Sequence, residues 1–243
     1  MKNILFLFAI VVSSFGIKPP LTGKVVLKKM HDRYAGKWYK TLFFNQTTEI
    51  YRNDSLVRSE TWHEHIQFPQ NFRIDFGDPD SGNAVIFKND SSVIFRNSKK
   101  IKTNYYPNDL LFLLGGMYFY PFEESVSKIA SFGFDPGKFH EDVWKDKKVY
   151  VIGAEKKEDS VSQVWFDTEN YNLVRMIKFE NKQKEEALFE NHVKLNGGFS
   201  ETLVYFYVNN KLVQVEKYYG LKADIRLNTH IFDPVNFTKI QLQ

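Results

Sequence analysis

The sequence predicts a mainly β fold of the α+β type, in which one curled antiparallel sheet of about eleven strands carries helices inserted at two places. Three observations predict it. Segments that alternate apolar and polar residues recur along most of the chain, with clusters of turn-forming residues between them. Aromatic residues, which favour strands, make up 16% of the chain, with 23 Phe and 13 Tyr. The connections are short, which joins neighbouring strands in antiparallel pairs.

The first residues have the pattern of a secretory signal peptide. Lys2 is followed by an apolar core over residues 4–12 and by the small-x-small segment Ser14–Gly16. We therefore expect residues 1–16 to be a signal peptide and residues 17–243 to form a single domain in the periplasm. An N-terminal membrane anchor is the alternative, although the apolar run is short for a span, which needs about 20 residues.

The composition excludes several classes of protein. The chain has no cysteine, so it has no disulfide, no thiol nucleophile and no cysteine for lipid attachment. The net charge is +4, and basic residues are interspersed with acidic ones, which argues against nucleic acid as a partner. We expect a monomer without a cofactor.

The N-terminal half begins with a helix and continues with strands. Leu27, Met30, Tyr34 and Trp38 recur at helical spacing, Thr22 is a candidate N-cap and Gly36 a candidate end. The alternating segments that follow predict strands at 38–48, 49–52, 56–67, 72–76, 83–88, 92–96 and 99–105.

Two helices then interrupt the strands. Residues 110–119 are too apolar for a surface loop and predict a short helix closed by glycines. Residues 121–131 place Phe122, Val126 and Ile129 at helical spacing. Helices this rich in Leu and Phe have to bury their apolar faces, and the concave face of the sheet is the nearest apolar surface. Strands resume at 147–154, 162–167, 173–180, 185–194, 202–208, 211–218 and 222–227.

Motifs for catalysis and metal binding are weak. The sequence has neither a Gly-x-Ser-x-Gly elbow nor a glycine-rich phosphate loop. His63 and His65 fall on one face of a predicted strand and could share a metal ion, but no third ligand is apparent. Asp78, Asp80 and Asn83 form part of a calcium-loop pattern that Pro79 breaks, so we interpret this segment as a turn. We assign no catalytic residue and no metal ligand.

Several segments resemble the LolA/LolB-like family of outer-membrane lipoprotein-sorting carriers. Residues 149–154 and 164–175 are similar to the paired central strands of that family and to their Asp-containing hairpin. Residues 204–213 and Phe232-Asp233-Pro234 are similar to its last hairpin and terminal signature. The resemblance covers roughly residues 25–239 and includes the order of helices and strands.

The resemblance implies a half-open antiparallel β-barrel of about eleven strands with a helical lid, which carries acyl chains in its apolar interior. On this basis Leu110, Leu111, Leu113, Leu114, Met117 and Phe119 belong to the lid, and Phe72, Ile74, Phe76 and Trp165 line the cavity. Two features depart from the family. Neither Arg52 nor Arg58 matches the strand arginine that holds the lid in some carriers, and the cysteine of the membrane-anchored branch is missing.

These observations favour a periplasmic carrier, not an enzyme, that binds the acyl chains of a lipid or an acylated lipoprotein and serves outer-membrane lipoprotein sorting or lipid trafficking. An envelope transporter or a membrane acceptor would be its partner.

One alternative is a sensory or protein-binding module that uses a sheet edge or the concave face. A hydrolase lacks a visible nucleophile–base pair, and a perturbed carboxylate or histidine in the cavity would favour it. A further alternative is that residues 110–119 fill a core that takes no ligand.

Overall fold

The computed structural model describes residues 20–180 and 182–238. The expected signal peptide, residues 1–16, lies outside the described residues. Within the described ranges, no helix is both long enough and apolar enough to cross a membrane.

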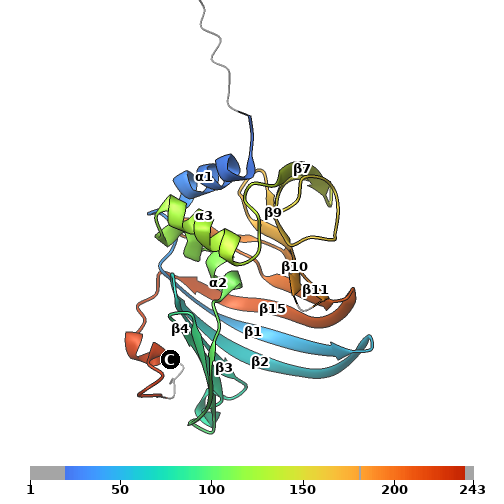
Figure 1. The fold of residues 1–243 in the computed structure, drawn as a ribbon. Helices are drawn as coiled ribbons and strands as arrows, with labels where there is room; N and C mark the ends of the chain where they lie inside the picture. Colours follow the sequence, from blue (N-terminus) through green and yellow to red (C-terminus); the bar gives the residue numbers. More distant parts are fainter. Residues whose placement is uncertain (1–19, 181, 239–243) are drawn as a thin grey trace, which may run out of the picture.

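One antiparallel sheet of 13 strands forms the framework, with strands from both halves of the chain (Figure 1). The order across it is β6-β5-β4-β3-β2-β1-β15-β14-β11-β10-β9-β8-β7. A separate two-stranded sheet pairs β12 with β13. The strand bounds are β1 Thr41–Arg52, β2 Ser55–Gln67, β3 Asn71–Phe76, β4 Ala84–Lys88, β5 Ser91–Arg96, β6 Lys99–Tyr105, β7 Phe139–Trp144, β8 Lys147–Ile152, β9 Gln163–Asp167, β10 Leu173–Glu180, β11 Gln183–Glu190, β12 Val193–Leu195, β13 Gly198–Ser200, β14 Leu203–Val208 and β15 Lys211–Ala223.

Tight two-residue turns join many of these strands. Asn53 and Asp54 connect β1 to β2 with φ values of 49° and 61°, and Asn209 and Asn210 connect β14 to β15 with 49° and 64°. Positive φ at both central residues defines the type I′ turn, whose twist matches that of the flanking strands. Asn and Asp adopt this conformation more readily than other non-glycine residues do, so the local sequence determines these hairpins.

The long strands β1 and β15 join the two halves of the sheet, while β6 and β7 are its edges. The chain crosses from one edge to the other between residues 105 and 139, and this connection carries α2 (Asp109–Leu113), the 3₁₀ turn η2 (Gly116–Phe119) and α3 (Phe122–Ser131). We call residues 108–132 the lid. The sheet is curved, and its edge strands do not pair with each other to close it (Figure 1).

The first helix, α1 (Gly23–Tyr34), packs beside the lid (Figure 1). Thr22 caps it, because the Thr22 hydroxyl accepts a hydrogen bond from the Val25 backbone N–H at 3.3 Å. The helix contacts α3, η2 and β8 through buried residues that include Leu27 and Met30. Together α1 and the lid cover the concave face of the sheet, and the main core lies between them.

The structure corrects several expected boundaries. The main sheet has 13 strands instead of about eleven, and one of them, β7, was not expected from the sequence. Residues 38–52 contain one long strand, β1, instead of two. Strand β15 continues through Gly220, whose φ is +67°. At this point the pairing of β15 with residues 43–45 of β1 shifts register and forms a bulge. Residues 110–119 split into α2 and η2 because two glycines, Gly115 and Gly116, follow α2.

The convex face of the sheet carries separate, smaller clusters. One contains Val149, Val151 and Trp165, and another contains Ile86, Val93 and Phe95. The C-terminal segment, residues 228–238 with the 3₁₀ turn η3 (Thr229–Phe232), contacts β3 and β4. The fold therefore buries apolar residues on both faces of the sheet, and the α-helices of the described chain lie on the concave face.

Candidate functional site

A cavity of about 200 Å³ lies between the lid and the concave face of the sheet. Its apolar walls include Leu42, Phe44, Ile66, Phe72, Ile74 and Leu111. Successive residues of a strand point to opposite faces, so alternate residues of β1, β2 and β3 reach the cavity. Aromatic and aliphatic side chains from sheet and lid therefore surround the same space.

Half of the residues that the sequence placed in this site line the cavity. Phe72 and Ile74 contribute from β3, and Leu110, Leu111 and Leu114 contribute from the lid. Phe72 is also stacked on Phe87, which lines the cavity from β4, with the ring centroids 5.4 Å apart.

Four of the predicted residues lie near the cavity without lining it. Phe76 packs edge-on against Trp62, a lining residue, with centroids 5.0 Å apart. Leu113 and Met117 are buried in the main core, between the helices and the concave face of the sheet. Phe119 is stacked on Phe68 with centroids 5.6 Å apart, so it attaches the lid to the end of β2.

Trp165 does not line the cavity, which corrects the expectation from the sequence. It lies in the convex-face cluster, where its ring meets Trp144 at 5.4 Å and the Arg175 guanidinium at 4.6 Å. All five residues of β9 are buried because both faces of this strand are covered. A strand buried on both faces has no apolar alternation, and the sequence could not indicate the side to which Trp165 points.

Polar contacts attach the lid to the sheet. The Lys178 ammonium on β10 lies 2.5 Å from the carboxylate of Asp109, the first residue of α2. Burial lowers the pKa of Lys178, but the hydrogen bond and charge of Asp109 outweigh it and raise the pKa overall. At the far side of the lid, the Gln70 amide donates to the Tyr120 hydroxyl at 2.7 Å. A lysine–aspartate pair thus holds the lid in this chain.

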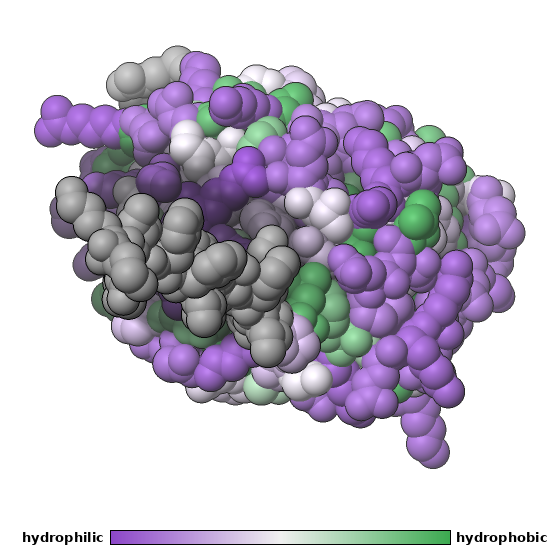
Figure 2. All heavy atoms as spheres, turned by 90° about the horizontal axis from the view of Figure 1, so that it is seen from above, coloured by the Kyte–Doolittle hydropathy of each residue, from purple (hydrophilic) through white to green (hydrophobic). Residues whose placement is uncertain are grey.

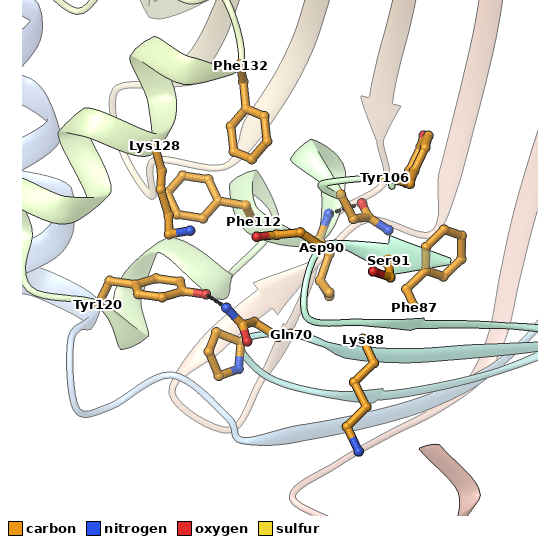
Figure 3. A pocket seen from close by; sticks show the side chains of 13 residues that line it. Gln70, Phe87, Lys88, Asp90, Ser91, Tyr106, Phe112, Tyr120, Lys128 and Phe132 are labelled. Atoms are coloured by element: carbon orange, nitrogen blue, oxygen red, sulfur yellow. Dashed lines mark hydrogen bonds between the residues drawn. The ribbon is translucent and has the colours of Figure 1, made fainter. Parts of the chain in front are cut away.

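A small cleft lies at the rim of the cavity, between the lid and the turns that precede β3 and β5 (Figure 3). Phe112, Tyr120 and Lys128 border it from the lid, and Gln70 and Asp90 border it from the sheet. It shares Phe87, Tyr106, Asn108 and Leu111 with the main cavity, so these four side chains separate the two spaces.

The cavity also contains three carboxyl groups that the sequence analysis did not identify. Glu64 on β2, Glu201 before β14 and Glu216 on β15 line it, with exposed fractions of 4%, 6% and 7%. Burial, and then the neighbouring carboxylates, raise the pKa of Glu64 well above its usual range and that of Glu201 to about 7. One feature of the sequence indicates the position of Glu64. In the alternating pattern of β2, Glu64 falls on the same face as Trp62 and Ile66, which also line the cavity.

The candidate metal ligands lie on the opposite face. The His63 imidazole is 2.7 Å from the Asn45 side-chain oxygen, and the ring of His65 packs on Phe43. Burial, together with Arg73 and His63, lowers the pKa of His65 to about 4. Within residues 20–180 and 182–238, no three His, Asp or Glu side chains are grouped so that they could hold a metal ion.

The segment from Asp78 to Gly82 forms a turn, as the sequence indicated. The Asp78 carboxylate accepts a hydrogen bond from the Asp80 backbone N–H at 2.9 Å and caps the 3₁₀ turn η1 (Pro79–Ser81). This arrangement uses the aspartate as a cap.

The face that bears the helices is largely hydrophilic where it can be seen (Figure 2). The apolar residues of α1 and of the lid, such as Met30, Leu113 and Met117, are buried. The lid therefore covers the cavity with an apolar inner face and a polar outer face.

Comparison with solved structures finds the same fold in three proteins. A DUF1329 family protein from Desulfovibrio piger is 11% identical, with 89% of this chain and 98% of that chain covered and a TM-score of 0.61. A LolA superfamily protein from Nitrosomonas europaea is 14% identical, with 89% of this chain and 99% of that chain covered and a TM-score of 0.59. A domain from Vibrio parahaemolyticus described as an outer membrane lipoprotein-sorting protein is 10% identical, with 87% of this chain and 96% of that chain covered and a TM-score of 0.61. No family model and no curated protein matches the sequence. At these identities the similarity shows the fold alone, a mainly β antiparallel sheet with few helices. This confirms the fold class that the resemblance implied, while the number of strands is 13 instead of about eleven.

Proposed function

We propose that this protein is a periplasmic carrier that binds the acyl chain of a lipid or of an acylated lipoprotein in the cavity under its lid. The observation that carries the proposal is the cavity itself, whose walls are mainly aromatic and aliphatic and whose cover is a separate segment that packs on the core through apolar side chains and is joined to the sheet by polar contacts at its two sides. The fold shared with a LolA superfamily protein supports it.

Burial of apolar surface provides the affinity in this proposal. Each methylene moved from water into the cavity contributes about 0.8 kcal/mol. The cavity of about 200 Å³ is smaller than most ligand sites, which occupy roughly 300–1,000 Å³. A long acyl chain therefore requires the lid to move away from the sheet, and the Lys178–Asp109 pair and the Gln70–Tyr120 hydrogen bond are the contacts that this movement breaks.

Transfer of the ligand requires a donor and an acceptor, for which we propose an envelope transporter and a membrane acceptor. Both would act on the lid, because the lid covers the cavity. No covalent step is needed for loading or release.

The buried carboxyl groups meet one condition for a hydrolase, since a raised pKa suits a general acid or base. The hydroxyl of Ser200, which also lines the cavity, donates to the backbone oxygen of Glu201 at 3.1 Å instead of to a carboxylate. Among the lining residues, the hydroxyl that does meet a carboxylate is that of Tyr218, which donates to Glu216 at 2.6 Å. Burial raises the pKa of Tyr218 well above its usual range, so this hydroxyl keeps its proton and is a poor nucleophile. The geometry therefore favours binding over hydrolysis.

Native mass spectrometry with organic extraction tests the proposal on protein purified from a bacterial periplasm without detergent. We expect a bound lipid or acylated species that is lost in Leu114→Glu, which places a charge on the lid wall of the cavity. Ile101→Glu is the matched control, because Ile101 is 57% exposed on edge strand β6. An unliganded mass, together with no uptake of added amphiphiles of any head group, would contradict the carrier and favour the protein-binding module. A shortened, hydrolysed product would instead favour the hydrolase.

A further inference from the structure

The charges in the cavity are all of one sign. Glu64, Glu201 and Glu216 line it, and no Lys, Arg or His is among the described residues that do so. The other titratable residues in its lining are Tyr39, Tyr106 and Tyr218. Burying a carboxylate without a counterion is costly, and buried charges in proteins are normally paired. These carboxyl groups can therefore be charged at low cost only when a cation enters the cavity.

Hydrogen-bond donors are also scarce at this site. Glu216 is satisfied, because the Tyr218 hydroxyl donates to it at 2.6 Å and the Gln214 amide donates at 2.5 Å. The Glu64 carboxyl, although only 4% exposed, has no hydrogen-bond donor and no ion-pair partner among the described residues, and the charged groups that act on its pKa are the carboxylates of Glu216 and Glu201. The side-chain oxygen of Gln46, on neighbouring strand β1, is buried and likewise without a donor in the described part of the chain.

The two unsatisfied groups belong to one wall of the cavity region. Gln46 pairs in register with Trp62 of β2 on one side and with Tyr218 of β15 on the other, and both of these residues line the cavity. Both Glu64 and Gln46 are acceptors. Polar groups buried this deeply are usually hydrogen-bonded, so the arrangement points to a donor that arrives with the ligand.

We propose that the cavity takes an amphiphile whose polar end is a protonated primary amine, with the ammonium against the Glu64 carboxyl and the hydrocarbon chain among the apolar walls. This inference deepens the proposed function and rests on it. An ammonium group carries one positive charge and three donors, which matches an excess of acceptors and of negative charge. The metal alternative is not supported, because the carboxyl groups of the cavity are not arranged to hold a metal ion.

Binding of an ammonium is coupled to the protonation of the cavity. Burial, and then the neighbouring carboxylates, raise the pKa of Glu64, and burial raises that of Glu201 to about 7, so in the free protein this cluster keeps protons at pH values where an exposed glutamate is charged. A bound cation favours their charged form and releases a proton. Affinity for the amine therefore rises with pH, by about tenfold per pH unit below about pH 7 if one proton is released.

The same charges select against anions. A fatty acid that placed its carboxylate beside Glu64 would add a fourth acidic group to a site with no cation, and like charges in a buried site disfavour each other. An alcohol of the same length satisfies the acceptors but not the charge. Head-group preference at constant chain length therefore isolates the contribution of the carboxyl cluster.

Isothermal titration calorimetry with dodecylamine, dodecanol and dodecanoate, each kept below its micellar concentration, tests the inference. At pH 8 we expect the amine to bind more tightly than the alcohol by on the order of tenfold, as for a charge-assisted hydrogen bond. Glu64→Gln should abolish most of this preference while leaving the affinity for dodecanol unchanged. Glu141→Gln is the control, since Glu141 is exposed on edge strand β7 and does not line the cavity.

The pH series on the wild type gives a second test that needs no variant. Dodecylamine affinity should rise between pH 5 and 8 while dodecanol affinity stays constant. Equal affinities for amine and alcohol at pH 8, or an amine preference that survives in Glu64→Gln, would overturn the amine site and leave the carrier intact. If none of the three amphiphiles binds, both the inference and the proposed function are wrong.

Discussion

The Lys178 ammonium and the Asp109 carboxylate, separated by 69 positions in the chain, are 2.5 Å apart where α2 meets β10. Asp109 is 7% exposed, so removal of the lysine leaves a nearly buried carboxylate without its partner. This pair holds the end of the lid that carries the cavity-lining residues Leu110, Leu111 and Leu114.

We expect Lys178→Met to destabilise the closed position of the lid by about 1–3 kcal/mol, because a buried acceptor loses its charged donor. Hydrogen exchange should become faster in residues 109–119 and stay unchanged in β1 and β15. Lys217→Met is the control, since Lys217 pairs with Glu49 at 2.6 Å on the surface, where ion pairs contribute about 0–1 kcal/mol. Unchanged exchange in the lid of Lys178→Met would show that this pair does not hold it.

The position of Trp165 predicts a separation of stability from ligand binding. Trp165→Leu should lower the free energy of unfolding by about 1–3 kcal/mol, because Arg175 loses one of the two indole rings that enclose it. The affinity for an amphiphile should not change, since Trp165 lies on the convex face. Phe72→Leu, within the cavity, should lower that affinity. Loss of ligand binding in a folded Trp165→Leu protein would contradict the placement.

Arg73 connects the C-terminal segment to the convex face of the sheet. Its guanidinium forms an ion pair with Asp75 at 2.7 Å and donates to the backbone oxygens of Ile231 and Thr238 at 3.0 and 2.8 Å. Arg73→Met should destabilise the protein by about 3–5 kcal/mol, because it leaves the buried Asp75 carboxylate unpaired.

The double variant Arg73→Met, Asp75→Leu separates the two roles of this arginine. Replacing both members of a buried ion pair by apolar residues is often close to neutral, so the double variant should recover most of the lost stability. It should not recover the hydrogen bonds to residues 231 and 238, and limited proteolysis should then cut within residues 228–238. Full protection of this segment in the double variant would show that Phe237, stacked on Phe95 at 4.1 Å, suffices to hold it.

The sequence predicted the elements whose signals are local. Thr22 marks the start of α1, and the paired Asn and Asp residues with positive φ mark hairpin turns such as 53–54 and 209–210. Strand β7 was missed because its sequence, Phe-His-Glu-Asp-Val-Trp, is half polar, as suits a strand at the edge of the sheet. Pairing with β8 determines its conformation, and pairing between strands cannot be read from one segment.

The candidate site could be predicted only in part, for a related reason. Phe72, Ile74 and the leucines at 110, 111 and 114 could be found from apolarity and phase alone. Glu64 lies between two histidines in a polar segment of β2, and its burial depends on the lid and on Glu216 from the other end of the chain. The alternation of β2 indicates that Glu64 shares a face with Trp62 and Ile66, but it does not indicate that this face is buried at Glu64.

The carboxyl cluster also predicts how stability depends on pH. The pKa of Glu201 is raised to about 7 and that of Glu64 well above 4.5, so the folded state holds more protons than the unfolded state. Stability contributed by a raised carboxyl is lost as pH rises from the unfolded pKa through the folded one. The lowered pKa values of His65 and His192 act in the opposite direction, but mainly below about pH 6.5, where an unfolded histidine is protonated.

Between pH 6.5 and 8 the carboxyl effect should therefore dominate. We expect the free energy of unfolding of the unliganded protein to fall over this range, with Glu201 alone contributing on the order of 1 kcal/mol, since one pKa unit corresponds to about 1.4 kcal/mol. Urea denaturation at several pH values measures it, and Glu64→Gln should make the dependence weaker while Glu141→Gln leaves it unchanged. Because the amide that replaces the Glu64 carboxyl has no charge to bury, the Glu64→Gln variant should also be the more stable protein at pH 8. A stability that is constant or rises from pH 6.5 to 8 would mean that these carboxyls ionise normally, in contact with water that enters the cavity.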